Sequence, residues 1–504
     1  MVADLERCVG CQTCSAACRH ANHTSPGVQW RKVLDIEAGS YPDVARVFVP
    51  VGCQHCEDPP CMHVCPTTAT RKRADGIVTV AYDLCIGCAY CDVACPYQAR
   101  FKISRPRRAF GVATRDELLG DDARLRGVSQ KCTFCSDRID AGTARGLVPG
   151  LDPEATPACV NACIADALHF GDTEDPRSNV SQLLRDNTHF RMHEELGTTP
   201  GFYYLNAYRH RDARPVSGPV SGPDVEPRHQ AHWDWKAAMN FMCGGSGAAL
   251  AVVAVLLADP TLLAAGLLLT AAGLGVLFFK IGRPRRFLHV FRQPRRSWMS
   301  REAWAAAALF PLGAAYALSG WAVFAAATAA AAVAFLVCQG MILRCAKGIP
   351  VWRAASTAAV MVCTGCTEGI GLACLVHPAA YALAAAIALR GVAWLVFSIE
   401  LQRAGVPVRS HAALRAVRPW LFWGGTVAPL LLLFAGWMLG WTPSTAAAAV
   451  GTPAMAAAAV ITVAAGWLFK FTLVTRAAYH QGYALKHADT DIKPGWLRAD
   501  TPRH

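Results

Sequence analysis

Charged side chains are scarce in this sequence, and they are unevenly distributed. Asp, Glu, Lys and Arg make up 17% of the 504 residues, whereas 53% of the residues are hydrophobic. The sequence also lacks a phosphate-binding glycine loop, a nucleophile elbow and a zinc-protease motif. We therefore expect no substrate turnover by this chain alone.

The first seven residues contain no apolar core of the kind that a signal peptide requires. Disulfide frameworks belong mainly to small secreted domains, so disulfides are a poor explanation for the 22 cysteines. Sixteen of the cysteines lie before residue 164, and six lie in the apolar second half. We expect the first sixteen to be metal ligands.

The positive net charge does not predict nucleic-acid binding. The net charge is +13, but the arginines form no helical stripe with interleaved aromatic residues. Many arginines lie between apolar segments, which is the pattern that orients membrane proteins. The expected partner of these residues is membrane lipid, and no nucleic acid is expected.

Four groups of cysteines have the spacing of iron–sulfur ligands. Cys85, Cys88, Cys91 and Cys95, with Pro96 next, reproduce the bacterial ferredoxin spacing for a 4Fe–4S cluster. The other groups are Cys8, Cys11, Cys14 and Cys18; Cys53, Cys56, Cys61 and Cys65; and Cys132, Cys135, Cys159 and Cys163. Sixteen thiolates, four for each cluster, predict four 4Fe–4S clusters.

In two-cluster ferredoxins the last cysteine of a group ligates the partner cluster. This rule pairs the second group with the third and the first with the fourth. The predicted ligand sets are Cys8, Cys11, Cys14 with Cys163; Cys53, Cys56, Cys61 with Cys95; Cys85, Cys88, Cys91 with Cys65; and Cys132, Cys135, Cys159 with Cys18. Zinc is the alternative metal, but zinc sites close with two CxxC pairs and need no third cysteine two residues on.

The expected fold class is an α+β ferredoxin-like domain followed by an all-α membrane bundle. The cluster domain is expected at residues 1–208, with a strand near 76–82 and a small helix near 162–170. A linker is expected at 209–231, where Val-Ser-Gly-Pro repeats. The bundle takes the remainder, 232–504.

Apolar runs of about 20 residues predict eight transmembrane helices in the bundle. We place them near 237–258, 261–281, 303–320, 321–343, 354–376, 378–398, 420–441 and 450–474. Their many alanines and glycines suit close packing of helices in a membrane. A soluble helical bundle would need polar faces that these runs lack.

Basic residues occupy alternate loops of the expected bundle. They are Arg283, Arg285, Arg286, Arg292, Arg295, Arg296 and Arg301 after the second span; Arg344, Lys347 and Arg353 after the fourth; and Arg403, Arg409, Arg415 and Arg418 after the sixth. The other turns contain no lysine or arginine. With an even number of spans, the positive-inside rule places both termini and the cluster domain on the cytoplasmic side of the inner membrane.

No pair of histidines is placed to ligate a haem inside the spans, because His289, His377, His411 and His480 lie at span ends or in loops. We expect no haem and an exchangeable quinone or quinol instead. Glu368 and Arg390 lie within spans, where charges are costly, so they predict an ion pair or a proton path. Cys363 and Cys366 form a CxxC in a span, where packing is a better explanation than redox chemistry.

The block from Cys53 to Arg100 resembles the four-cluster electron-transfer subunits of molybdopterin oxidoreductases of the dimethyl sulfoxide reductase family. The resemblance rests on Cys53-Gln-His-Cys-Glu-Asp-Pro-Pro-Cys61, Gly76-Ile-Val78 and Cys91-Asp-Val-Ala-Cys-Pro-Tyr97. It covers residues 1 to about 208. It implies a separate molybdopterin-containing catalytic subunit as partner, and a role for this chain in carrying electrons to or from a membrane anchor.

The stretch from Gly282 to Glu302, above all Ser297-Trp-Met-Ser-Arg-Glu302, resembles a loop of the anchor subunits of the same family. In that family a histidine just before this loop acts with the glutamate in quinol oxidation. Lys280 stands near the position of that histidine, and His289 follows further on. The resemblance therefore implies a fusion of two subunits, with Lys280, His289, Arg301 and Glu302 beside the quinone.

Two other functions fit the same sequence. The same electron path could serve sulfite, polysulfide, tetrathionate or phenylacetyl-coenzyme A chemistry, because cluster ligands do not contact the substrate of the partner. An ion transporter with a redox-sensing domain is the alternative of another class. The lack of interrupted helices in matching halves counts against a transporter.

Overall fold

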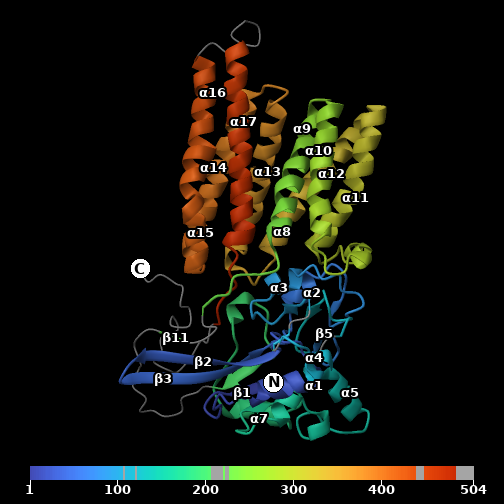
Figure 1. Cartoon of the computed structure of the whole chain (residues 1–504), viewed down its shortest axis with the longest axis vertical. Coiled ribbons are helices and arrows are strands. Elements are labelled where there is room, and N and C mark those ends of the chain that lie inside the picture. The colour runs from blue at the N-terminus through green and yellow to red at the C-terminus, as the bar shows by residue number, and fades with distance from the viewer. Residues whose placement is uncertain are drawn as a thin grey trace. The chain divides into compact units, whose positions relative to one another are not determined.

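The computed structural model of the chain describes residues 1–105, 108–109, 111–119, 122–205, 220–221, 226–438 and 448–483. These residues form two compact units (Figure 1). The first unit comprises the described residues of 1–228 together with 480–483, and the second comprises those of 229–479. Most of the linker expected at 209–231 lies outside the described residues. The return of 480–483 to the first unit differs from the expected division at residue 232.

The first unit combines short strands with short helices. Its strands are β1 (Val2–Asp4), β2 (Arg31–Ser40), β3 (Asp43–Gly52), β4 (Thr70–Lys72), β5 (Val78–Val80), β6 (Phe101–Lys102), β7 (Ser129–Gln130), β8 (Leu168–His169), β9 (His189–Phe190), β10 (Tyr203–Leu205) and β11 (Val220–Ser221). Its helices are α1 (Thr13–Asn22), α2 (Pro60–His63), α3 (Tyr90–Ala94), α4 (Arg115–Leu119), α5 (Ser136–Thr143), α6 (Ala158–Asn161) and α7 (Asn179–Asp186), with 3₁₀ turns η1 (Pro153–Ala155) and η2 (Glu194–Leu196).

Four small sheets hold the first unit together. Their strand orders are β8-β1-β10-β9, β11-β2-β3, β4-β5 and β6-β7. The strand expected near 76–82 is present as β5, which pairs with β4. The prediction of a helix near 162–170 is wrong. α6 ends at Asn161, and β8 takes the later residues because Leu168 and Ala3 pair across the sheet at the N-terminal strand.

The long hairpin of β2 and β3 was not among the expected elements. Its ten residue pairs run from Arg31 opposite Gly52 to Ser40 opposite Asp43. β-branched side chains such as Val33, Val49 and Val51 lie in the core, which is the behaviour that favours strands. The base of the hairpin therefore belongs to the same core as the cysteine-bearing loops.

The second unit is a bundle of long apolar helices. Its elements are α8 (Trp235–Met239), η3 (Asn240–Gly244), α9 (Gly245–Leu256), α10 (Pro260–Phe278), η4 (Pro284–Arg292), α11 (Trp298–Ser319), α12 (Ala322–Arg344), η5 (Pro350–Trp352), α13 (Thr357–Cys374), α14 (Ala380–Arg403), α15 (Val408–Pro419), η6 (Trp420–Val427), α16 (Ala428–Met438), α17 (Ala448–Phe471) and η7 (Thr472–Arg476). Three of these, η3, η6 and η7, are π-helical turns inside longer helices.

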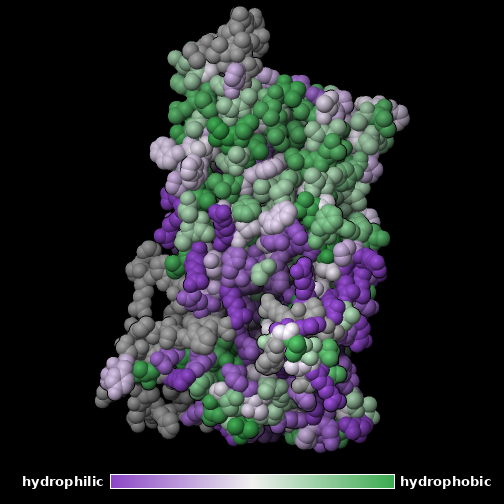
Figure 2. Space-filling view, in the orientation of Figure 1, coloured by the Kyte–Doolittle hydropathy of each residue, from purple (hydrophilic) through white to green (hydrophobic). Residues whose placement is uncertain are grey.

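Seven helices among the described residues are long and apolar enough to cross a membrane. They are Trp235–Leu256, Pro260–Phe278, Ala322–Arg344, Thr357–Cys374, Ala380–Arg403, Val408–Met438 and Pro453–Arg476. On the face that Figure 2 shows, the side chains over these helices are mostly hydrophobic. The chain is therefore a membrane protein.

The seventh expected span begins earlier than its apolar run. Arg409, Arg415 and Arg418 were expected in a loop, but they lie on α15, which continues through η6 into α16. Long arginine side chains can reach the interface from the end of a membrane helix, so their charge did not mark the end of this one.

Glycines allow the helices of the bundle to pack closely. A Cβ atom on Gly247 would lie 2.5 Å from the carbonyl oxygen of Gly266, so the backbones of α9 and α10 nearly touch there. A Cβ atom on Gly369 of α13 would meet Ala249 of α9 at 2.5 Å. Small residues at helix contacts are typical of membrane bundles, where packing and not water exclusion drives association.

Candidate functional site

The structure brings the sixteen cysteines of the first unit together in four sets. Two of the sets line cavities. The first cavity is lined by Cys8, Cys11, Cys14 and Cys163, and the second by Cys65, Cys85, Cys88 and Cys91. Each of these two cavities is lined by the same four cysteines that the ferredoxin rule groups as one ligand set.

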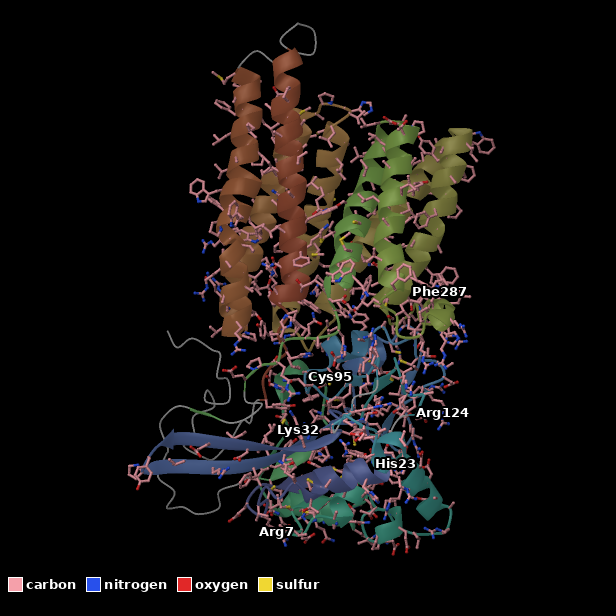
Figure 3. All side chains as sticks on the ribbon, in the orientation of Figure 1. Arg7, His23, Lys32, Cys95, Arg124 and Phe287 are labelled. Carbon is pink, nitrogen blue, oxygen red and sulfur yellow. The ribbon has the colours of Figure 1, made fainter. Side chains whose placement is uncertain are left out.

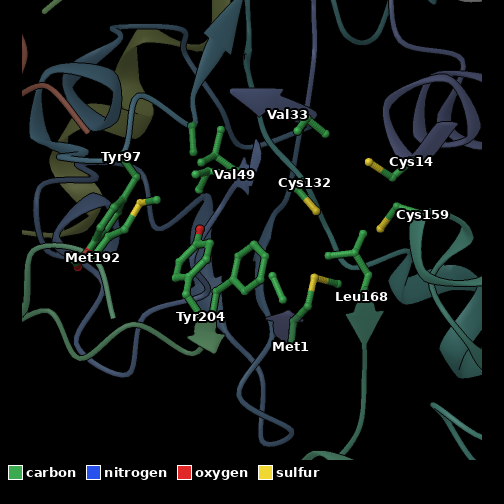
Figure 4. Packing of buried hydrophobic residues seen from close by; sticks show 14 of the residues in the cluster. Met1, Cys14, Val33, Val49, Tyr97, Cys132, Cys159, Leu168, Met192 and Tyr204 are labelled. Atoms are coloured by element: carbon green, nitrogen blue, oxygen red, sulfur yellow. The ribbon is translucent and has the colours of Figure 1, made fainter. Parts of the chain in front are cut away.

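In each of the other two sets, the thiols lie close enough together to shift the pKa of a neighbouring thiol. Burial raises the pKa of Cys56 well above its ordinary value, and Cys53, Cys61 and Cys95 raise it further. Burial likewise raises the pKa of Cys18, with added contributions from Cys132, Cys159 and Cys135. In Figure 4, Cys132 lies with Cys14 and Cys159 in the core, and Figure 3 places Cys95 within the first unit.

The cysteine loops have the backbone conformation needed to wrap a compact group. Gly10 and Gln12 in the first loop, and Gly87 and Ala89 in the third, all have positive φ between 61° and 71°. Amide groups also point at the sulfurs. The N–H of Phe134 donates to Cys132 Sγ at 3.4 Å, and the N–H of Ala167 donates to Cys163 Sγ at 3.2 Å. Hydrogen bonds to sulfur are among the features that tune iron–sulfur clusters.

The thiols fit a cluster better than a single ion. Four thiolates on one Zn²⁺, each at about 2.3 Å, would have their sulfurs roughly 3.8 Å apart. Among the described residues, no group of three or more His, Cys, Asp or Glu side chains has the arrangement to hold one metal ion. Each of the two cavities instead has its four thiols around a common space, as a four-iron cube requires.

Gly10 offers a test of the first loop. Its φ is +70°, and a Cβ atom there would collide with the ring of Phe48. Gly10→Ala is expected to lose the cluster of the first set, measured as a loss of about four iron ions per chain. Gly76→Ala is the matched control, because Gly76 has φ +79° but open space around it, so it is expected to cost only about 1 kcal/mol. Equal iron contents in the two variants would contradict this role of Gly10.

Sequence reasoning missed two arginines that are buried among the thiols. Burial opposes the charge of Arg31, but the neighbouring thiolates of Cys159 and Cys132 outweigh it, so the pKa of Arg31 is raised. Arg100 behaves in the same way beside Cys61, within hydrogen-bond reach of that thiol. A buried cation compensates for the negative charge that thiolate ligands bring. The sequence offered only a weak hint of them: Arg100 follows shortly after Cys95, and Arg31 pairs across the hairpin with Gly52, the residue before Cys53.

In the second unit, Glu302 is buried in the second turn of α11, with only 3% of its surface exposed. Asn240 Nδ2 donates to Glu302 Oε1 at 3.1 Å, and Gln339 lies within hydrogen-bond reach of the same carboxylate. The side chain of Trp304 fixes the loop before the helix by donating to the carbonyl of Phe291. Asn240 and Gln339 were not among the expected site residues, because single amides in apolar runs resemble ordinary packing positions.

The other expected quinone-site residues lie around the loop that precedes α11. Lys280 Nζ lies 4.8 Å from the centroid of the Trp233 ring. His289 is half-buried in η4, beside Phe287, which Figure 3 marks. Arg301 donates to the carbonyls of Pro294 and Arg295 at 2.7 and 2.8 Å. Arg301 therefore binds the backbone of its own loop.

Glu368 and Arg390 are not paired as the sequence suggested. Glu368 Oε2 accepts from Lys470 Nζ at 2.5 Å and from Ser246 Oγ at 2.7 Å. Arg390 instead donates to the backbone carbonyls of Thr462 and Gly425. Lys470 was missed, although it is a lone lysine near the end of the last apolar run and an unpaired cation there would be costly.

Comparisons with known proteins concern the first unit. Residues 44–109 match the model of the 4Fe-4S dicluster domain. Over 221 residues the chain is 41% identical to a protein named as an iron–sulfur subunit of dimethyl sulfoxide reductase in Halobacterium salinarum, covering 41% of this chain and 78% of that protein. It is 39% identical over 221 residues to a subunit of selenate reductase from Mesobacillus selenatarsenatis, covering 41% and 70%.

The name of a third relative includes menaquinone. The iron–sulfur cluster-binding subunit of menaquinone reductase from Nitratidesulfovibrio vulgaris is 37% identical over 226 residues, covering 41% of this chain and 88% of that protein. In all three relatives the similarity covers two thirds or more of their length but less than half of this chain. In this chain a bundle of apolar helices follows the iron–sulfur unit.

Proposed function

Because the chain belongs to the family of iron–sulfur electron-transfer subunits of dimethyl sulfoxide reductase-type oxidoreductases, we propose that it carries electrons between a molybdopterin-containing catalytic subunit and the membrane quinone pool. The observation that carries the proposal is the combination, in one chain, of four sets of four cysteines with a membrane bundle that buries a carboxylate near its basic loops. Substrate chemistry belongs to the partner subunit.

The sixteen cysteines are the proposed ligands of four 4Fe–4S clusters, one for each set. Two cysteine sets share the neighbourhood of Arg31, and two share that of Arg100, so the clusters come in two pairs. Clusters of this kind supply one-electron transfer over a wide range of potentials. The role of the protein is to hold them in a continuous series and to shield them from water.

We propose α11 as the eighth transmembrane helix. It has 22 residues and packs against both α10 and α12. His229 and Tyr479, at the two ends of the second unit, pair in an antiparallel bridge, so the chain enters and leaves the bundle at one end. That requires an even number of crossings. The basic loops lie at this same end by connectivity, and the positive-inside rule then makes it cytoplasmic, with the cluster domain on that side.

The proposed quinone site lies around Glu302, where the buried carboxylate can exchange a proton with a quinol hydroxyl. Lys280 and His289 precede α11 and Arg301 lies in its first turn, and we include all three in the proposed site. Glu368 and Arg390 lie deeper in the bundle. No haem is proposed, because His289, His377 and His411 lie near helix ends and His480 belongs to the first unit.

The proposal is tested by reductive titration of the anaerobically purified protein, followed by electron paramagnetic resonance with iron quantified. About sixteen iron ions per chain are expected, and a quinol analogue is expected to reduce clusters without another reductant. A co-purifying large subunit is expected to contain molybdenum. Bound zinc with little iron would contradict the clusters. A full iron content that no quinol can reduce and no quinone can oxidise would contradict the link to the quinone pool.

A further inference from the structure

Seven polar side chains, Glu302 among them, form a series that runs into the interior of the bundle. They come from η3, α9, α11, α12, α13 and α17, and all except Trp467 are at most 3% exposed. The seven are Asn240, Ser246, Glu302, Gln339, Glu368, Trp467 and Lys470. Polar groups are rare inside membrane bundles, and a connected series of them indicates a path for ions or protons more often than a packing device.

At one end of the series, two amides bridge Glu302 to the core. Asn240 donates from its side chain to Glu302, and its backbone carbonyl accepts from Gln339 Nε2 at 2.8 Å. Asn240 belongs to the π-helical turn η3, which widens the helix locally. The turn therefore presents both the side chain and a carbonyl of the same residue to the series.

At the middle of the series, a glycine provides the space where two polar groups meet. A Cβ atom on Gly245 would lie 2.8 Å from Lys470 Nζ and 2.9 Å from Gln339 Oε1. Both groups thus approach the same point on the backbone of α9. Any larger residue at this position would push them apart.

At the other end, the Glu368 carboxylate has one satisfied and one unsatisfied oxygen. Oε2 accepts from Lys470 and Ser246, and Trp467 Nε1 donates to Ser246 Oγ at 2.9 Å. Oε1 is buried without a hydrogen-bond partner and lies against Gly466. Gly466 also lines the cavity that contains Arg390, so the carboxylate stands between the series and that cavity.

A purely structural ion pair does not account for this arrangement. Burying a charged group is tolerated when its hydrogen bonds are complete, yet both Glu368 Oε1 and Asn240 Oδ1 lack partners. Buried polar groups without protein partners are the usual positions of internal water. Water at Asn240 Oδ1 would lie on the Glu302 side of the series, and water at Glu368 Oε1 would lie on the Gly466 side of that carboxylate.

We propose that this series is a proton path between Glu302 and the Glu368–Lys470 pair. The inference rests on the proposed quinone site at Glu302. A quinol that gives two electrons to two oxidised clusters also releases two protons and becomes quinone. The Glu302 carboxylate accepts one proton and the other is released to bulk water; water held by Asn240 and Gln339 passes the first proton on, and the Glu368 carboxylate binds it. Reduction of quinone runs the same steps in reverse.

The test uses the complete complex in proteoliposomes and redox-difference infrared spectroscopy started by a quinol analogue. We expect a carbonyl band of a newly protonated carboxylic acid that shifts in D₂O, disappears in Glu368→Gln and moves in Glu368→Asp. The band should persist in Glu400→Gln, because Glu400 accepts from the backbone N–H of Ser356 outside the series. A band unchanged in Glu368→Gln would overturn the inference.

A second pair of variants tests the path itself. Gly245→Ala is expected to slow steady-state turnover at least tenfold while the first reduction of the clusters keeps its rate. Gly275→Ala is the matched control, because a Cβ atom on Gly275 meets nothing within 4 Å. Equal turnover rates in the two variants would overturn the proposed proton path. If quinol fails to reduce the clusters of the unsubstituted complex, the proposed function fails instead, and the two failures are thus distinguishable.

Discussion

Cys95→Ala is expected to lower the iron content from about sixteen to about twelve ions per chain and to remove the paramagnetic signal of one cluster. Cys95 is 8% exposed and shares its set with Cys53, Cys56 and Cys61. Its cluster and the cluster of Cys65, Cys85, Cys88 and Cys91 form a pair, because both lie beside Arg100, so its loss should also interrupt electron transfer through the chain. Iron analysis and spectroscopy after reduction by dithionite measure both effects.

Cys363→Ala is the control for this substitution, because Cys363 lies on α13 of the second unit and belongs to none of the four sets. It should retain the full iron content and every cluster signal. If Cys95→Ala also retained about sixteen iron ions, Cys95 would not be a ligand. Cys95→Ser is a second test variant, since a hydroxyl of similar size can hold the loop in place while binding iron less well.

Glu302→Gln is expected to slow the reduction of the clusters by quinol at least 100-fold, within the range of about 10² to 10⁴ that a positioned acid or base contributes. Glutamine keeps the shape of the side chain and its contact with Asn240, but its amide cannot accept the proton of a quinol hydroxyl. Stopped-flow absorbance of the clusters after mixing with a quinol analogue measures the rate.

The iron content and the reduction of the clusters by dithionite should be normal in Glu302→Gln, which separates proton transfer from folding. Glu400→Gln is again the control, since it changes a carboxylate at the end of α14 that binds the backbone at Ser356. A quinol rate in Glu302→Gln equal to that of the unsubstituted protein would contradict a role for Glu302 in quinol chemistry.

The two classes of structure in this chain were predictable to different degrees. Apolar runs of membrane length are a local property, and each of the eight expected runs is largely helical where the structure describes it. Seven of the described helices are long and apolar enough to cross a membrane. The resemblance to iron–sulfur subunits is confirmed by the relatives. The hairpin at 31–52 and the β8 strand were missed, because short strands form only where a partner strand from a distant part of the chain supplies their hydrogen bonds.

The sequence by itself determined the kind of chemistry: the spacing of cysteines is a local signal, since a loop of a few residues must present several thiols to one cluster. Only the tertiary structure decided which polar groups meet. Arg31 reaches the thiols through the hairpin, and Lys470 takes the place expected for Arg390 beside Glu368. These partners are far apart in the sequence or lie on separate helices. An unpaired charge is costly in a low-dielectric interior, so which groups pair depends on which ones the packed structure brings together.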